Sequence, residues 1–109
     1  MLSFTLSPNG IDSDYDWVLF DFSTGSCDDI SNDDSFIVSC NSYGDPFFNG
    51  PTGISSVNGG TGNSNGPGNL NGPAFNQDVS VIEGETYLLY IQDWSGNSEG
   101  YTLNFIEST

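Results

Sequence analysis

Alternating aspartates stand at the start of a strongly apolar run. The segment Asp12-Ser-Asp-Tyr-Asp16 carries a carboxylate at every second position and leads directly into Trp17-Val-Leu-Phe20. Side chains two residues apart in an extended chain point to the same side, so alternate carboxylates there can converge on one cation. The segment has neither the glycine nor the closing glutamate of an EF-hand loop, and solvated aspartates in an ordinary turn are the competing interpretation.

A second acidic loop follows the most apolar run of the chain. Asp93 comes directly after Thr86-Tyr-Leu-Leu-Tyr-Ile-Gln92, and serine and asparagine follow it by residue 97. Serine, asparagine and main-chain oxygens are hard ligands that calcium accepts. Alone, this loop is an ordinary turn. Combined in space with the first segment, it predicts a calcium site formed by Asp14, Asp16 and Asp93.

The charge balance also favours a bound cation. The chain has 109 residues with 15 Asp and Glu and no Lys, Arg or His, so its carboxylates repel one another without any side-chain salt bridge. Either the acidic surface is simply solvated, or cations from solution replace the missing basic residues, and oxygen ligands suit calcium best. We expect no nucleic-acid partner, because phosphate binding needs Lys or Arg. We expect no direct membrane insertion, because no run approaches the roughly 20 apolar residues of a membrane helix.

Two cysteines, Cys27 and Cys40, bracket a short polar segment. A cysteine pair in a small, loop-rich, acidic domain favours an oxidising compartment and a disulfide. Closing a loop of this length is worth about 3 kcal/mol in the chain-entropy model. Two free buried thiols are the alternative, whereas zinc lacks the further ligands it needs. The sequence therefore predicts an extracellular protein with a Cys27–Cys40 bond.

Catalysis has little support in the residue types. There is no His to act as a base and no Lys or Arg to hold an anion, which leaves a carboxylate pair acting on a glycosidic bond as the remote enzymatic alternative. We expect a non-catalytic protein. Trp94, Tyr43 and Phe47 stand in polar segments and offer rings that can stack on sugars, so a carbohydrate-binding module is the second hypothesis. Packing is the competing role for Trp94, and Trp17 is expected in the core.

Short β-rich runs separated by turn residues predict the fold. Apolar alternation or β-branched and aromatic residues mark six strands, at residues 2–6, 16–22, 36–40, 78–82, 86–92 and 101–106. Residues 42–77 are expected to be mostly loop, and 58–69 form a Gly/Asn-rich stretch with little to bury. We therefore expect an all-β antiparallel β-sandwich, jelly-roll or CUB-like, with one long loop, over residues 1–109.

The order of several motifs resembles a recurrent module of large surface proteins of gliding bacteria that are exported by type IX secretion. These motifs are Asp14-Tyr-Asp-Trp-Val-Leu-Phe-Asp-Phe22, Val38-Ser-Cys-Asn41, Pro51-Thr-Gly-Ile-Ser55, Val81-Ile-Glu-Gly-Glu-Thr-Tyr-Leu-Leu-Tyr-Ile91 and Ser95-Gly-Asn-Ser-Glu-Gly-Tyr-Thr-Leu-Asn-Phe105. The resemblance spans nearly the whole chain. It implies a cell-surface location and an adhesive or spacer role, with other copies, neighbouring modules or glycans as partners.

A weaker similarity is to CUB domains, which are small extracellular β-sandwiches. It rests on Tyr15-Asp16, on Gln92-Asp-Trp-Ser95 and on Gly100-Tyr101. By this likeness Asp16 and Asp93 are calcium ligands. The upstream glutamate of those domains has no counterpart here, and Asn9 or Asp14 is the candidate substitute.

The bacterial module usually has one or two strands before the equivalent of residues 2–6, and these are absent here. Either the chain is a fragment or a neighbour supplies a strand. An open edge beside residues 2–6 would invite pairing, so we expect the strands at 2–6 and 101–106 to join copies into a homo-oligomer or filament. The favoured function is a calcium-stabilised extracellular module with an adhesive or structural role.

Overall fold

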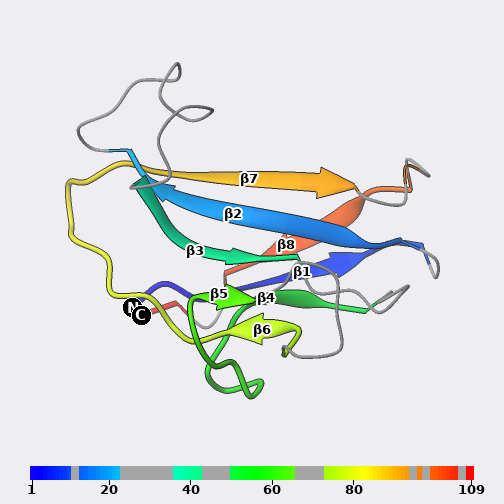
Figure 1. Cartoon of the computed structure of the whole chain (residues 1–109), viewed down its shortest axis with the longest axis horizontal. Helices are drawn as coiled ribbons and strands as arrows, with labels where there is room; N and C mark the ends of the chain where they lie inside the picture. Colours follow the sequence, from blue (N-terminus) through cyan, green and yellow to red (C-terminus); the bar gives the residue numbers. More distant parts are fainter. Residues whose placement is uncertain are drawn as a thin grey trace.

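The chain folds as two packed four-stranded sheets (Figure 1). The computed structural model describes residues 1–10, 13–22, 36–42, 50–65, 73–93, 96, 99–105 and 108–109. One sheet has the order β6-β4-β1-β8 and the other the order β5-β3-β2-β7. The strands are β1 (Phe4–Pro8), β2 (Tyr15–Asp21), β3 (Ile37–Asn41), β4 (Thr52–Ile54), β5 (Ser64–Asn65), β6 (Phe75–Asn76), β7 (Tyr87–Asp93) and β8 (Tyr101–Asn104). The predicted all-β sandwich is confirmed, although the short β3–β5 and β4–β6 pairings are parallel.

Alternation along β2 builds the core. Successive side chains of a strand point to opposite faces, and the inward positions of β2 carry Tyr15, Trp17 and Leu19. Trp17 is 1% exposed, and its ring meets Phe4 edge-on with centroids 5.0 Å apart. Its Nε1 donates a hydrogen bond of 3.1 Å to Oγ1 of Thr52 in the opposite sheet. Trp17 is therefore a core residue, as predicted. The buried apolar cluster comprises Phe4, Leu6, Tyr15, Trp17, Leu19, Ile54 and Val79.

Where β5 and β6 lie at one side of the sandwich, hydrogen bonds between asparagine side chains take the place of apolar packing. The fully buried Asn76 accepts hydrogen bonds through Oδ1 from Asn41 and Asn65, at 2.9 and 2.7 Å. Its Nδ2 donates to Oγ of Ser39 and to the carbonyl of Cys40, both at 2.8 Å. A buried amide is tolerated when its donors and acceptors are paired, so this network holds the two sheets together without apolar side chains.

This polar network explains one error of the sequence prediction, and a second error lies directly after it in the chain. Residues 42–77, expected to be mostly loop, contain β4, β5 and β6. These strands have two or three residues each, too few for a periodic pattern, and Asn and Ser side chains stabilise them. Conversely, the strand expected at 78–82 is reduced to a single bridge between Val79 and Leu2.

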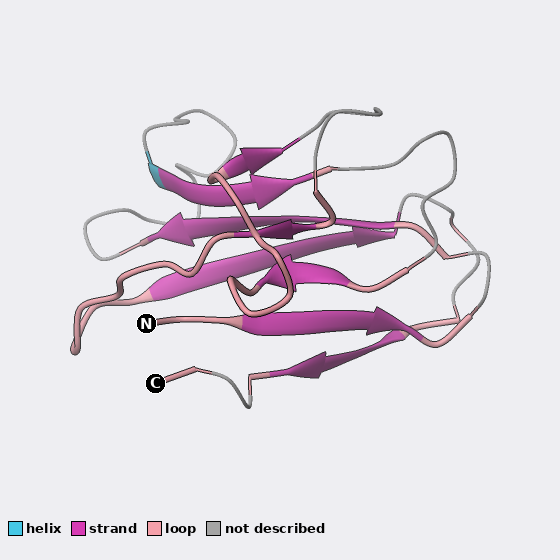
Figure 2. Cartoon of the chain, turned by 90° about the horizontal axis from the view of Figure 1, so that it is seen from below, coloured by secondary structure: helices cyan, strands magenta, loops and turns pink. Residues whose placement is uncertain are grey.

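The first strand is not an edge, which corrects the expected open edge beside residues 2–6. β1 pairs antiparallel with β4 on one side and with β8 on the other. The C-terminal strand β8 does end the order of its sheet, and pairing between copies through it stays a prediction. The two chain ends lie side by side, where the amine of Met1 donates to the carbonyl of Thr109 at 2.7 Å (Figures 1 and 2). Within the described ranges, no helix is long and apolar enough to cross a membrane.

Candidate functional site

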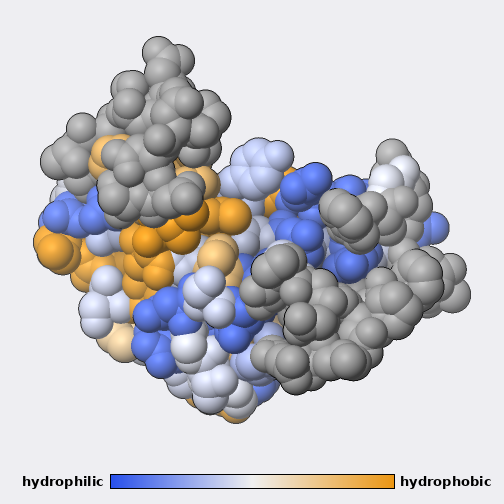
Figure 3. Space-filling view, viewed as in Figure 1, coloured by the Kyte–Doolittle hydropathy of each residue, from blue (hydrophilic) through white to orange (hydrophobic). Residues whose placement is uncertain are grey.

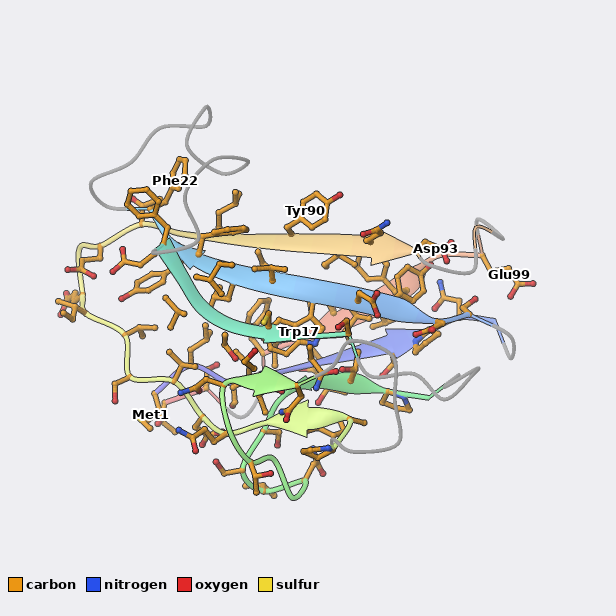
Figure 4. All side chains as sticks on the ribbon, in the orientation of Figure 1. Met1, Trp17, Phe22, Tyr90, Asp93 and Glu99 are labelled. Carbon is orange, nitrogen blue, oxygen red and sulfur yellow. The ribbon has the colours of Figure 1, made fainter. Side chains whose placement is uncertain are left out.

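Acidic residues gather at one end of the sandwich, where β2 begins and β7 ends. Figure 4 shows Asp93 and Glu99 at this end and Met1 at the opposite end. The chain has no Lys, Arg or His, so no basic side chain faces these carboxylates, and the amine of Met1 is far from them. Mutual repulsion of the carboxylates is therefore uncompensated by the protein itself.

The register of β2 on β7 sets the geometry of the predicted aspartates. Tyr15 lies opposite Asp93, and Asp16 lies opposite Gln92. Directly opposed residues of an antiparallel pair share a face, and neighbours alternate, so Asp16 and Asp93 project from opposite faces of the sheet. The register therefore does not bring the carboxylates of Asp16 and Asp93 together directly. Asp14, which precedes Tyr15, is the residue that neighbours both.

Asp14 is a strongly perturbed carboxyl of the cluster. Its side chain is 7% exposed, and its pKa is raised from 3.8 to about 6, first by burial and then by the charges of Asp16 and Asp93. The half-buried Asp16 also has a raised pKa, caused by burial. Loss of hydration and like charges both disfavour the ionised form of a carboxyl. The predicted residues are thus coupled electrostatically through Asp14.

Asp93 has a local role in its turn as well. Its Oδ1 accepts a hydrogen bond of 2.9 Å from the amide of Gly96, which fixes one oxygen of the carboxylate against the loop after β7. Burial of the Tyr15 hydroxyl and then the neighbouring charge of Asp93 raise the pKa of Tyr15, and Glu99 contributes in the same direction. Asp93 and Glu99 therefore face the same region around the Tyr15 hydroxyl.

Glu99 is a member of the cluster that the sequence did not single out. Its carboxylate occupies the space that a Cβ on residue 10 would fill, so a larger residue than Gly10 would displace the end of the Glu99 side chain, and Oγ of Ser13 lies beside the same space. Main-chain hydrogen bonding fixes this approach, because the amide of Asn9 donates to the carbonyl of Gly100 at 2.9 Å. Asn9 Nδ2 also donates to the carbonyl of Glu99 at 3.3 Å.

The donor set suits a hard cation. Carboxylates, a serine hydroxyl and an asparagine carbonyl oxygen are oxygen ligands of the kind that calcium prefers. In the part of the chain that the structure describes, no three acidic or cysteine side chains already stand together at metal-binding positions. Calcium held here would draw on Asp14, on either Asp16 or Asp93, and on Glu99, with further oxygens from main chain and water. Asn9, the other suggested substitute for the missing glutamate, lies beside Glu99 rather than at the aspartates.

The remaining predicted residues lie largely outside the described part of the chain. This applies to Trp94, Tyr43 and Phe47, named for sugar stacking, and to Cys27 of the predicted disulfide. Cys40 is half-buried in β3 and forms no disulfide with a described residue, and its Sγ lies 3.5 Å from Oγ of Ser64. Because its partner cysteine is not described, the Cys27–Cys40 pairing stays a prediction.

Comparison with known proteins adds no family to this picture. No family model, no curated protein and no solved structure matches the chain. The resemblances to type IX-secreted modules and to CUB domains therefore remain expectations from the sequence, and the fold and the acidic end are what the function has to be argued from.

Proposed function

We propose that this chain is a non-catalytic extracellular surface module, stabilised by calcium, with an adhesive or structural role. One observation carries the proposal: Asp14 is held almost without solvent exposure between two further aspartates in a chain that has no basic side chain. Such an arrangement opposes folding at neutral pH unless a cation from solution neutralises it.

Calcium is the cation that suits this end of the molecule best. It accepts six to eight oxygen ligands at roughly 2.3–2.6 Å in adaptable geometry, and it takes carboxylates together with main-chain oxygens and water. Magnesium demands a stricter octahedron and keeps most of its water. Because Asp16 and Asp93 project from opposite faces of the sheet, the adaptable ion fits better than the strict one.

The extracellular setting is part of the proposal. Calcium is abundant outside cells, and extracellular calcium modules function with weak sites of about 10⁻⁴–10⁻³ M. A net charge of −15 and the predicted Cys27–Cys40 bond support the same setting. In this account the chain is a module of the type IX-secreted, gliding-associated kind. Its partners are other copies or neighbouring modules of a surface protein.

Glycan binding is a second candidate function, which one ring favours. Tyr101 is 42% exposed, and its ring meets Tyr15 edge-on with centroids 5.3 Å apart. This contact holds a partly exposed ring against Tyr15, whose hydroxyl is also near the charges of Asp93 and Glu99, so sugar hydroxyls would find acceptors in the same region. Glycan-array binding that is lost on Tyr101→Ala, with the melting temperature retained, would favour this function over a purely structural one.

Calorimetric titration with calcium tests the main proposal. We expect heat of binding for the wild type and a melting temperature that rises with calcium and falls in chelator. Asp93→Asn should weaken calcium binding by about tenfold or more, because a charged ligand is lost. Glu83→Gln removes the same charge from an exposed turn and serves as the matched control. No heat for the wild type, together with no effect of chelator on melting, would refute the calcium site.

A further inference from the structure

The outer edge of β7 differs from the other three edges of the sandwich. The edge strands β5 and β6 have two residues each and β8 has four, whereas β7 has seven. β7 pairs with β2 in unbroken register along its whole length, without a bulge. Its sequence, Tyr87-Leu-Leu-Tyr-Ile-Gln-Asp93, contains neither proline nor lysine. Short strands, bulges, prolines and lysines are the features that normally protect a sheet edge, and β7 has none of them.

The main chain of β7 leaves hydrogen-bonding groups pointing away from the sheet. The amide of Phe22 donates to the carbonyl of Thr86 at 2.7 Å, which fixes the phase of the ladder between β2 and β7. Hydrogen-bonded positions alternate along an antiparallel strand, so Leu88 and Tyr90 bond to β2, while Leu89 and Ile91 direct their N–H and C=O groups outward. No hydrogen bond of the described residues uses these outward groups of Leu89 and Ile91.

The side chains of the same residues line an incompletely covered seam of the core. Asn76 joins β6 to β5 at one side of the sandwich, so β7 and β8 lie together at the other side. Here Leu89, Ile91 and Leu103 pack against the buried cluster but are only partly buried. At the corresponding positions of β1, β2 and β4, the core side chains are buried.

Exposed aromatic rings lie on the strands that flank this seam or directly after them. Tyr90, Tyr101 and Phe105 are 50%, 42% and 46% exposed. Figure 4 shows Tyr90 projecting from β7 away from the core, and Figure 3, in the same orientation, shows apolar surface over the left part of the molecule's face and hydrophilic surface to its right. Outward main-chain donors and acceptors and the exposed ring of Tyr90 thus lie on β7, beside an open core seam that β8 and its exposed rings flank on the other side.

We propose that the edge of β7 accepts an extended segment of another polypeptide, one that alternates apolar residues and carries Lys or Arg near its ends. The added strand would bond to the outward groups of Leu89 and Ile91, and every second side chain would cover the seam. The inference goes beyond the proposed function, and it needs no calcium ligand to be correct.

Charge decides which kind of segment fits. Glu85 lies just before the strand, Asp93 ends it, and Asp21 lies opposite its first residue, Tyr87. The whole chain has a net charge of −15 and no basic residue, so a second copy would bring only like charge to this edge. A basic strand instead places its ammonium or guanidinium groups beside these carboxylates, and complementary charge speeds association and selects the partner.

Amide hydrogen exchange with designed peptides tests the inference. The probe is a peptide of about nine residues that alternates valine and threonine and has a lysine at each end. A control peptide has glutamate in place of each lysine. Each peptide is added separately to the folded protein in a buffer that contains calcium. We expect the lysine peptide to slow exchange at the amides of Leu89 and Ile91 by about tenfold or more. The amides of Leu88 and Tyr90 should not change, because they already bond to β2.

A charge added to the edge supplies the matched variant. Tyr90→Lys should weaken the lysine peptide by about tenfold or more, because like charges then meet along the strand. Val57→Lys adds the same charge at a site that is 79% exposed and outside the strand, and it should change the affinity less than about threefold.

Three results would overturn the inference. One is unchanged exchange at Leu89 and Ile91 when the lysine peptide is saturating. Another is equal binding of the glutamate peptide, which would show that the partner does not need basic residues. The third is that, without any peptide, protection of both amides increases with protein concentration. This would show that a second copy of the chain occupies the edge.

Discussion

Replacing Asp14 by asparagine should stabilise the protein in chelator and destabilise it, relative to wild type, in calcium. Asparagine keeps the size of the side chain and retains a carbonyl oxygen, but it removes the charge that Asp16 and Asp93 oppose. Without calcium, loss of this charge removes the repulsion from the neighbouring aspartates and the cost of burying an ionised carboxylate. With calcium it removes a charged ligand. The two effects have opposite signs, so a single variant separates them.

The raised pKa of Asp14 sets the size of the effect without calcium. A rise from 3.8 to about 6 would correspond to a ceiling of about 3 kcal/mol at neutral pH. Asp14 lies at the end of the sandwich, where water screens part of the charge, so we expect about 1–2 kcal/mol. For a domain of this size that raises the melting temperature of Asp14→Asn by roughly 4–10 °C in chelator at pH 7.

The same carboxyl predicts how stability depends on pH in chelator. The folded protein keeps the proton of Asp14 up to a pKa of about 6, whereas the unfolded chain releases it near 3.8. Between these values the folded state binds more protons, so stability falls as pH rises through this interval and the loss is complete above pH 6. The wild type should therefore melt higher at pH 4 than at pH 7, and Asp14→Asn should show a smaller difference.

Differential scanning calorimetry at pH 7, in EDTA and in calcium, measures these effects. At a calcium concentration 100 times its Kd the wild type gains about 2.7 kcal/mol, and most of this gain should be lost in Asp14→Asn. Glu83→Gln, in an exposed turn, should change stability by less than about 0.5 kcal/mol in both buffers. A lower melting temperature for Asp14→Asn in EDTA would refute the repulsion argument. If calcium stabilised Asp14→Asn as much as the wild type, Asp14 would not be a calcium ligand.

Three further predictions concern other parts of the molecule. Gly10→Ala should displace the Glu99 carboxylate and weaken calcium binding by about tenfold, and an unchanged calcium titration would exclude Glu99 as a ligand. If Cys27 and Cys40 are bonded, as the sequence predicts, alkylation of the unreduced, unfolded protein leaves its mass unchanged; two added alkyl groups would disprove the bond. Asn76→Ala should cost about 3 kcal/mol, since its buried partners lose their hydrogen bonds, and a loss below about 1 kcal/mol by denaturant unfolding would contradict this.

The sequence predicts the fold best where apolar alternation is strong. The alternation around Trp17 and the run at 86–92 correspond to β2 and β7, which form the longest ladder of the molecule. β5 and β6 escape detection because two-residue strands carry no period, and because buried asparagines such as Asn76 look like loop residues in the sequence. The resemblance places strand β1 at an open edge, because the strands that usually precede it are absent here. The prediction is wrong because β1 pairs with β8, and a pairing of the two ends of the chain leaves no local pattern in the sequence.

The candidate site was also predictable only in part, because sequence patterns show residues next to apolar runs but not how the strands pair. Asp14 and Asp16 were found from their spacing before an apolar run, and Asp93 from its place after another. The opposite orientations of Asp16 and Asp93 depend on the register between β2 and β7, and no sequence pattern sets that register. Glu99 was missed because it reaches Gly10 only through the pairing of β1 with β8. A pairing of the two terminal strands, had it been assumed, would have placed this glutamate at the acidic end.

Crystals grown in calcium, measured at a wavelength where calcium scatters anomalously, test the central claim most directly. We predict an anomalous peak at the acidic end, about 2.3–2.6 Å from carboxylate oxygens of Asp14 and of at least one of Asp16, Asp93 and Glu99. The peak should be absent from crystals soaked in EDTA. A map in which these carboxylates are surrounded only by water, at calcium concentrations that saturate weak extracellular sites, would contradict it.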